Sequence, residues 1–332
     1  MRTKNSLSPE SIREIATGFQ KSRILLTAYE LGIFSFLGDE KKTSVETASA
    51  VGADPRATDR LMNALCGSGL LIKKKKKFFN SPLSSQFLVK GKPEFISGMM
   101  HTVNLWDRWS TLTGAVKKGT TIFDQRGTND RGKEWLSAFI AAMHDRAAKP
   151  SAEIIKAMDL SNVTSVLDVG GGSGAYAISF VRAKKGMKAT IFDLPNVLPL
   201  TRKYVGAAGL SDKISFIAGD YLKDSLGKGF DLVFLSAIIH SNSDRENRKL
   251  IAKCAGALNR GGRVVVQDFI MDEDRTQPAH GAIFALNMLV GTEAGDTYTE
   301  AEVAGWMEAA GLTKIGRHDT PFGTTQITGW KK

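Results

Sequence analysis

Short β-rich runs alternate with helical stretches through the second half of the chain, and this alternation restricts the fold more than any other feature. The helical stretches include AYAISFVRAKK and DRENRKLIAKCAGAL, and the β-rich runs are SVLDVGGG, KATIFDLP, ISFIAGD, FDLVFLSAII and GRVVVQDFI. Strands that alternate with helices in this way form a parallel sheet with helices on both faces. The sequence therefore predicts an α/β fold with a doubly wound, mostly parallel sheet.

The first third of the chain has a different pattern. Apolar residues follow a helical spacing from Ile12 onward, and Ser8-Pro9-Glu10 is typical of a helix start. Two more helices are expected on either side of a turn at 52–55, and LLIKKKKKFFNSP is typical of a two-stranded ribbon. This order is the winged-helix pattern. We expect an N-terminal winged-helix domain, all-helical apart from the ribbon, over residues 1–105, and a second domain over 106–332 that begins with linking helices at 106–150.

Composition narrows the cellular setting. No apolar run approaches the ~18 residues of a membrane span, and the first ten residues, MRTKNSLSPE, are too polar for a secretory signal. Cys66 and Cys254 are the only cysteines, too few for a disulfide framework or a thiolate zinc site. We therefore expect a cytoplasmic protein without a membrane span or a metal site.

The net charge of +11 is concentrated in one region. Residues 1–110 carry 17 Lys and Arg against 10 Asp and Glu, and five of these lysines form the run Lys73–Lys77. Lysines in the wing of a winged helix can contact the phosphates of a nucleic acid, so a nucleic-acid-binding protein is one alternative. However, the predicted recognition helix carries Asp54 and Asp59 beside its two arginines, and its apolar content indicates burial. We interpret the run as a solvated strand edge.

Three consecutive predicted strands each lead into an acidic residue. Asp168 ends the first and is followed by Gly170 and Gly172, which allow a tight turn and a close approach of backbone N–H groups to a ligand. The second strand ends in Asp193, followed by Leu194, and the third in Asp220, followed by Tyr221. An acid at such a position can accept hydrogen bonds from a ribose, and a Tyr ring can cover an adenine. The three strand ends predict an adenosine-binding edge.

Two kinds of adenosine cofactor remain possible at this edge. Gly170, Gly172 and Ala175 satisfy a loose G-x-G-x-x-A, and Asp193 follows about 20 residues later, as in dinucleotide-binding folds. A pyrophosphate, however, is favoured by neutral or positive surroundings at a helix N-terminus. The carboxylates of Asp168 and Asp220 suit a cationic sulfonium ligand better. The charge pattern therefore favours S-adenosylmethionine over NAD.

The order of LDVGGGSG, FDLP, AGDYL and a strand that ends in His240, preceded by a winged-helix region, resembles a known family. It is similar to the small-molecule O-methyltransferases of the plant caffeate and flavonoid type and of the bacterial polyketide-tailoring type, over essentially the whole chain. The resemblance implies a Rossmann-like sheet and S-adenosylmethionine as the cofactor. It also implies a homodimer in which the N-terminal domains exchange helices and close the partner's substrate pocket.

The resemblance also implies a catalytic base. In the family, a His follows the fourth strand in a His-Asp-Trp-Ser-Asp type motif, and His240 occupies its place, although Ser241-Asn242 replaces the Asp-Trp pair. Asp268 matches the acid that orients this His, one methylene shorter than the usual Glu. Thr297 stands where plant members have a second acid, and Ser236 stands where they often have a cofactor-contacting Lys.

The acceptor is expected to be a small, largely apolar or aromatic molecule with a hydroxyl group. A phenol has a pKa near ~10 and a His near ~6.5, so a positioned imidazole can remove the phenolic proton. Methylation of nitrogen, carbon or sulfur, or a reaction without methyl transfer, remains open on the same fold. Helices that flank the sheet are expected to line the pocket with Phe139, Met143, Phe284, Asn287 and Met288. His101 and His144 are interpreted as satisfied polar residues and not as a second base.

Overall fold

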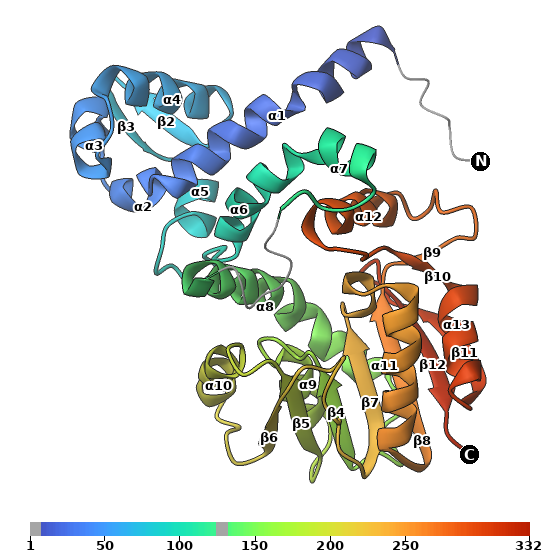
Figure 1. The fold of residues 1–332 in the computed structure, drawn as a ribbon. Helices are drawn as coiled ribbons and strands as arrows, with labels where there is room; N and C mark the ends of the chain where they lie inside the picture. The colour runs from blue at the N-terminus through green and yellow to red at the C-terminus, as the bar shows by residue number, and fades with distance from the viewer. Residues whose placement is uncertain (1–7, 124–131) are drawn as a thin grey trace. The chain divides into compact units, whose positions relative to one another are not determined.

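The computed structural model describes residues 8–123 and 132–332. Contacts between Cα atoms divide the chain into two compact units, Met1–Asn104 and Leu105–Lys332, and the division falls inside helix α6 (Met99–Trp109) (Figure 1). No helix in the described part is long and apolar enough to span a membrane.

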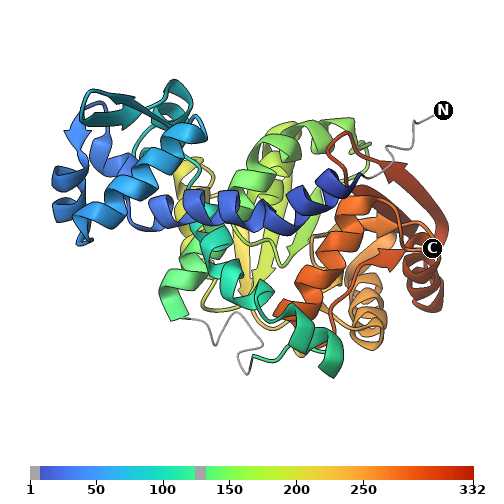
Figure 2. The ribbon, with the colours of Figure 1, turned by 90° about the horizontal axis from the view of Figure 1, so that it is seen from above.

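The N-terminal unit contains helices and, within its described residues, one small antiparallel sheet in the order β1-β3-β2. Its first helix, blue in Figure 2, begins at Pro9 because Ser8 caps it: the Ser8 hydroxyl accepts a hydrogen bond from the Ser11 N–H at 3.2 Å. The helices are α1 (Pro9–Glu30), α2 (Ile33–Leu37), α3 (Ser44–Val51), α4 (Pro55–Gly67) and α5 (Pro82–Phe87). The strands are β1 (Lys42–Thr43), β2 (Leu71–Lys74) and β3 (Lys77–Asn80).

The lysine run lies in the hairpin of β2 and β3, whose turn is at Lys75 with a φ of 57°. Lys73 contacts both the Asn63 amide oxygen at 2.8 Å and the face of the Phe78 ring, with its Nζ 4.5 Å from the ring centroid. The fully buried Phe78 in turn packs with Phe34 and Met62 in the core of this unit. The basic ribbon is thus anchored to the helices by its alternate, inward-facing residues.

The second unit is built on a sheet of seven strands among the described residues, in the order β11-β12-β8-β7-β4-β5-β6. Strands β4 to β8 are mutually parallel, whereas β12 pairs antiparallel with β8 and β11 antiparallel with β12. The strands are β4 (Ser165–Val169), β5 (Lys188–Asp193), β6 (Ile214–Ala218), β7 (Phe230–Ser236), β8 (Leu258–Asp268), β11 (Thr313–Asp319) and β12 (Thr325–Trp330). A separate parallel pair is formed by β9 (Ile270–Met271) and β10 (Tyr298–Thr299).

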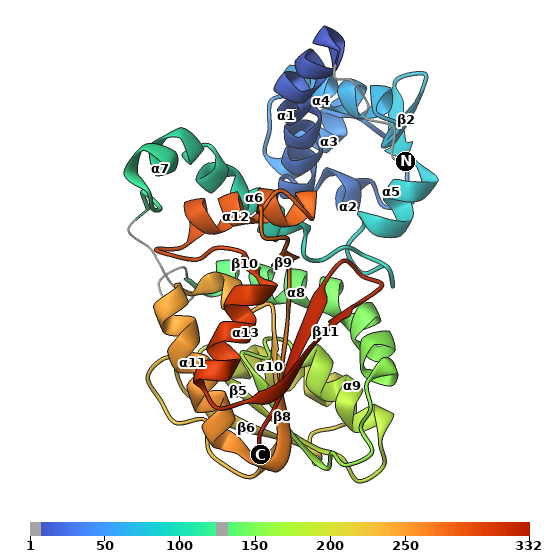
Figure 3. The same ribbon diagram turned by 90° about the vertical axis from the view of Figure 1, so that its right-hand side faces the viewer.

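Helices cover both faces of this sheet, as Figure 3 shows. One apolar cluster joins α8 (Gly132–Ala157), α9 (Ala175–Ala183) and α10 (Leu198–Ala207) to one face, and another joins α11 (Asp244–Ala257) and α13 (Glu300–Ala309) to the other. Alternate residues of each strand enter opposite clusters, as in Leu232 and Val233 of β7. The remaining helices are α7 (Leu112–Lys118) and α12 (Ala279–Gly291). The α/β fold with a mostly parallel, doubly wound sheet is therefore confirmed.

The strand order indicates where a ligand crevice is expected. The chain moves outward from β4 in one direction through β5 and β6, and in the other through β7 and β8. In open α/β sheets, ligands bind outside the carboxyl ends of the strands where the strand order reverses. The carboxyl ends of β4 and β7 are therefore the part of the unit in which a site is expected.

Candidate active site

The turn that joins β4 to α9 has a shape that depends on glycine. Gly170, Gly172 and Gly174 have φ values of 67°, 57° and 78°, in the left-handed region. A Cβ atom on Gly170 would lie 2.3 Å from Cδ1 of Ile238, a separation that no packed pair of carbons adopts. The Gly172 N–H donates to Oδ2 of Asp193 at 2.8 Å, which ties the turn to the end of β5. At Gly170 the turn thus leaves no room for a side chain, because the side chains of Ile238 and Tyr221 already pack against it.

Asp168 lies under this turn, and its side chain is buried. Its Oδ2 accepts a hydrogen bond from the Ala177 N–H at 3.2 Å, near the start of α9. Burial raises the pKa of Asp168 from its usual value near 3.8 to about 7; the Ala177 N–H opposes this shift, and the charge of Asp193 adds to it. No Lys, Arg or His within residues 8–123 and 132–332 forms an ion pair with Asp168, so its ionised form is a buried charge without a cationic partner in this part of the chain.

Asp193, the last residue of β5, is also buried. Its Oδ1 accepts from the Leu194 N–H at 2.7 Å, and its Oδ2 accepts from Gly172. Burial raises the pKa of Asp193 to about 6, although both backbone donors lower it. Each carboxylate oxygen keeps a further lone pair with which to accept a hydrogen bond from a ligand hydroxyl.

Asp220 and Tyr221 follow β6 and complete this edge. Oδ1 of Asp220 accepts from the Leu222 N–H at 2.9 Å, and Oδ2 lies 3.2 Å from the Lys223 ammonium. The Tyr221 ring lies against the glycine turn, since its Cε1 is 3.8 Å from the position of a Cβ on Gly170. The Tyr221 hydroxyl donates to Oδ1 of Asn242 at 3.2 Å, and burial raises the pKa of the phenol. The structure therefore brings the residues of the predicted adenosine edge together around one turn.

Ser236, at the end of β7, belongs to a buried polar network that the sequence did not reveal. Its hydroxyl accepts from the Gln267 amide at 3.1 Å, and the same amide donates to the Tyr176 hydroxyl at 2.6 Å. Gln267 accepts in turn from the Gln326 amide at 2.9 Å. Tyr176 is the second residue of α9, so this network links the start of α9 to the ends of β7 and β8.

His240 lies in a short 3₁₀ turn (Ile239–Ser241) after β7, and its side chain is nearly buried. Its Nδ1 is 2.9 Å from Oδ1 and 3.0 Å from Oδ2 of Asp268, the last residue of β8. A carboxylate can only accept, so Nδ1 donates to Asp268, and in the neutral imidazole Nε2 then keeps its lone pair. The Phe269 N–H also donates to Oδ1 of Asp268 at 2.9 Å, which fixes the carboxylate. The imidazole is thus oriented as a hydrogen-bond acceptor at Nε2.

The turn that carries His240 is held by its own neighbours. The side-chain amide of Asn247 donates to the Ile239 carbonyl at 2.9 Å, and the Asn242 N–H donates to the same carbonyl at 3.2 Å. On another side, a Cβ on Gly295 would lie 2.4 Å from the His240 carbonyl oxygen. Only glycine therefore permits the loop after α12 to pack this closely on the turn.

The motif residues after His240 have structural partners. Ser243 is the N-cap of α11, and with Glu246 it forms a capping box. Asp244 accepts from the Trp306 indole at 2.8 Å and pairs with Arg248 at 2.9 Å. These contacts anchor the start of α11 to α13.

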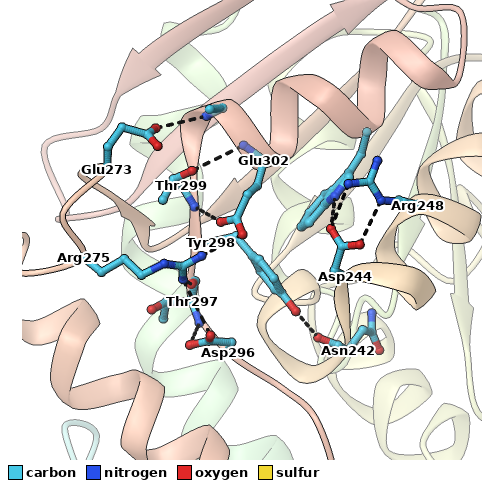
Figure 4. Close-up of polar contacts among 12 residues, drawn as sticks. Asn242, Asp244, Arg248, Glu273, Arg275, Asp296, Thr297, Tyr298, Thr299 and Glu302 are labelled. Atoms are coloured by element: carbon cyan, nitrogen blue, oxygen red, sulfur yellow. Dashed lines mark hydrogen bonds and ion pairs between the residues drawn. The ribbon is translucent and has the colours of Figure 1, made fainter.

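The loop that contains Thr297 is fastened by Arg275 (Figure 4). The guanidinium donates to the Thr297 carbonyl at 2.7 Å and to Oε1 of Glu302 at 2.7 Å. Glu302 also caps the start of α13 by accepting from the Thr299 N–H at 2.8 Å. The Tyr298 hydroxyl of this loop donates to the Asn242 carbonyl at 2.5 Å. The loop at the predicted second-acid position is therefore joined to the His240 turn.

The five residues predicted to line an acceptor pocket fall into two groups. Phe284 of α12 meets His240 edge to face, with centroids 4.8 Å apart, and contacts Phe269 in the same way at 5.0 Å. Asn287 accepts from the Trp109 indole at 3.0 Å, and Met288 is buried on the same helix. Phe139 and Met143 lie on α8. There Phe139 stacks on Trp135 and packs in a cluster that includes Leu194, beside the end of β5.

A cavity of about 790 Å³ lies elsewhere in this unit, between α8, α9 and α10. Its lining includes His144, Ile178 and Tyr204, but not His240, Asp268 or the acids at the strand ends. His144 contacts the Ser173 hydroxyl through Nδ1 at 3.0 Å and stacks on Tyr204. Burial lowers the pKa of His144, and its ring contacts the glycine turn through Ser173. The cavity is therefore separate from His240 and from the acids at the strand ends.

Comparisons with known proteins identify the family of the chain. Residues 109–313 match the family model of the O-methyltransferase domain, and residues 13–90 match that of the O-methyltransferase dimerisation domain. The chain is 31% identical over 319 residues to a 3-hydroxy-5-methyl-1-naphthoate 3-O-methyltransferase from Streptomyces sahachiroi, covering 92% of this chain and 90% of that protein.

Two solved structures extend the similarity to the whole fold. An O-methyltransferase family protein from Burkholderia thailandensis has a TM-score of 0.88 at 26% identity, covering 98% of this chain and 99% of that one. Human N-acetylserotonin methyltransferase in complex with S-adenosylmethionine has a TM-score of 0.85 at 26% identity, covering 100% and 99%. The resemblance seen in the motifs is confirmed, and S-adenosylmethionine is the cofactor. The chain belongs to the O-methyltransferase family and is a methyltransferase dependent on S-adenosylmethionine.

Proposed function

We propose that this enzyme methylates a hydroxyl group of a small, largely apolar or aromatic acceptor, with His240 as the general base and Asp268 as the residue that orients it. The observation that carries the proposal is the contact of Nδ1 with both oxygens of Asp268, at 2.9 and 3.0 Å, in a nearly buried pair. This contact leaves Nε2 free to take the proton of an acceptor hydroxyl. The ring of Phe284 beside it supports an aromatic acceptor.

The acids at the strand ends fit the cofactor. S-adenosylmethionine supplies a methyl group on a positively charged sulfonium and also carries an ammonium group. Asp168 and Asp193 are buried carboxylates whose pKa values are raised by burial, and a nearby cation stabilises their ionised forms. We assign the binding of the charged and ribose groups to Asp168, Gly170, Gly172 and Asp193, and that of the adenine end to Leu194, Asp220 and Tyr221. Ser236 provides support through Gln267.

The N-terminal unit is assigned to assembly. The match of residues 13–90 to a dimerisation domain supports a homodimer. Sedimentation velocity of the full chain tests this assignment, because a species of twice the chain mass is expected and a monomer at micromolar concentration would exclude it. The alternative role of this unit is nucleic-acid binding by the run Lys73–Lys77.

The base assignment is tested with a phenolic acceptor such as a hydroxynaphthoate. His240→Ala is expected to lower turnover by ~100-fold or more while the affinity for S-adenosylmethionine, measured by calorimetry, stays unchanged. An amine and a thiol of matched shape are assayed beside the phenol by product mass spectrometry. Unchanged turnover of the variant, or methylation of the amine or thiol alone, would overturn the proposal.

A further inference from the structure

Asn242 lies two residues after His240 and makes hydrogen bonds with both its side chain and its backbone. It is 4% exposed. Its amide nitrogen donates to Oδ1 of Asn247 at 3.1 Å, and its amide oxygen accepts from the Tyr221 hydroxyl at 3.2 Å. Its carbonyl accepts from Tyr298, as Figure 4 shows. The Trp that the family motif places here has only a donor and could not accept from Tyr221.

One end of this set of contacts lies at the cofactor edge. Tyr221 follows Asp220, and its ring is packed against the glycine turn at Gly170. Its hydroxyl points away from the turn, toward Asn242. A ligand that positions the Tyr221 ring therefore also positions the Asn242 side chain.

The other end lies at the base. Asn247 accepts from Asn242 and donates to the Ile239 carbonyl at 2.9 Å, and Ile239 directly precedes His240. The donors all point one way, from Tyr221 through Asn242 and Asn247 to Ile239. Hydrogen bonds in such a chain polarise one another, and within a buried region they hold a single geometry.

We propose that Asn242 is a positioning residue whose side-chain amide connects the cofactor edge at Tyr221 to the turn that presents His240. The inference rests on the proposed function for the roles of His240 and of the cofactor edge. This enzyme thereby uses an Asn in place of the motif Trp to couple cofactor binding to the placement of the base.

The test is a double-mutant cycle in the full-length protein. Tyr221→Phe, Asn242→Ala and the double variant are measured for S-adenosylmethionine affinity by calorimetry and for kcat on a phenolic acceptor at saturating cofactor. Each single change is expected to lower kcat by about 10-fold, since one buried hydrogen bond of the chain is lost in each. The double variant is expected to lose no more kcat than the more impaired of the two single variants, because both changes break the same chain of hydrogen bonds.

Tyr298→Phe is the matched control. It also removes one hydroxyl that contacts Asn242, but this hydroxyl meets the backbone carbonyl and lies outside the amide chain. Its kcat and cofactor affinity are expected to stay within about twofold of the wild type, even if its melting temperature falls. A loss of kcat equal to that of Asn242→Ala would overturn the proposal. So would losses of kcat that add in the double variant, or an Asn242→Ala variant that has a lower melting temperature and an unchanged kcat.

Two further variants allow the result to be interpreted if Asn242→Ala does not fold or if the base assignment fails. Tyr221→Phe removes a single oxygen atom and carries the test if Asn242→Ala does not fold: a fall in kcat at saturating cofactor supports the connection, and a change in affinity alone opposes it. His240→Ala is measured in the same series. If that variant keeps full turnover, the base assignment fails, whereas the calorimetric cycle between Tyr221 and Asn242 still shows whether the connection exists.

Discussion

Gly170 offers a direct test of why the cofactor turn is built from glycine. In Gly170→Ala, the new Cβ meets Cδ1 of Ile238 at 2.3 Å, and the residue keeps a φ of 67°. The left-handed conformation costs ~1–2 kcal/mol for a residue with a Cβ, and overpacking of this kind adds ~1–3 kcal/mol. The total is about 2–5 kcal/mol, which corresponds to a melting temperature lower by roughly 5–15 °C for a unit of this size.

Gly186→Ala separates the two costs. Gly186 has a φ of 84°, but nothing lies within 4 Å of its Cβ position, so only the conformational cost of ~1–2 kcal/mol applies. The steric part is tested by Ile238→Val, which removes the clashing Cδ1 atom. Combined with Gly170→Ala, it is expected to recover about 1–3 kcal/mol relative to the sum of the single changes. Thermal unfolding followed by circular dichroism measures all four variants. Equal effects at Gly170 and Gly186, or no recovery with Ile238→Val, would refute the reasoning.

Two further predictions concern the charged groups of the site. Asp268→Asn leaves an amide that can turn its NH₂ toward the imidazole and favour the wrong tautomer. The kcat on a phenol is therefore expected to fall by ~100-fold or more with unchanged cofactor affinity. Initial rates and calorimetry measure these two quantities, and a rate within threefold of wild type would contradict the prediction. The raised pKa of Asp168, about 7 against 3.8 when unfolded, means that the folded ligand-free protein binds the proton more tightly, so its stability falls as pH rises from about 4 to 7. The shift corresponds to about 4 kcal/mol, and Asp168→Asn is expected to raise the melting temperature at pH 8 and flatten its pH dependence. Wild-type affinity for the cationic cofactor should rise over the same pH window, and a pH-independent affinity would count against an ionised Asp168 as its partner.

The sequence predicted the five parallel strands β4 to β8 because each carries a short apolar run and they alternate with stretches of helical period. It did not predict β11 and β12. TKIGRHD is mostly exposed and polar, and the apolar residues of TQITGW are separated by Thr328 and Gly329, so neither has the apolar run that marks a buried strand. Both become strands because β8 leaves an unpaired edge, a tertiary cause that no local window contains.

The acids at the strand ends could be predicted from the sequence because parallel strands end at the same edge of the sheet, so the residues after them lie close together. Contacts between residues that are far apart in the sequence could not be predicted in this way. Arg275 reaches Thr297, and Tyr298 reaches Asn242 over a separation of 56 residues. Likewise, Phe284 and Phe139 both look like core residues of helices, and only the packing of the helices distinguishes the ring beside His240 from the ring beside Leu194.

The position of β12 has a consequence for the integrity of the protein. It pairs with β8 from Trp330 opposite Arg263 to Thr325 opposite Asp268. Without it, the backbone groups of β8 that face β12 between Arg263 and Asp268 would lose their partners, next to the Asp268 carboxylate that contacts His240. Such an open, β-branched strand invites addition of a strand from another molecule. Damage to the last strand is therefore expected to appear first as aggregation in concentrated samples, before any change in the chemistry of molecules that remain folded.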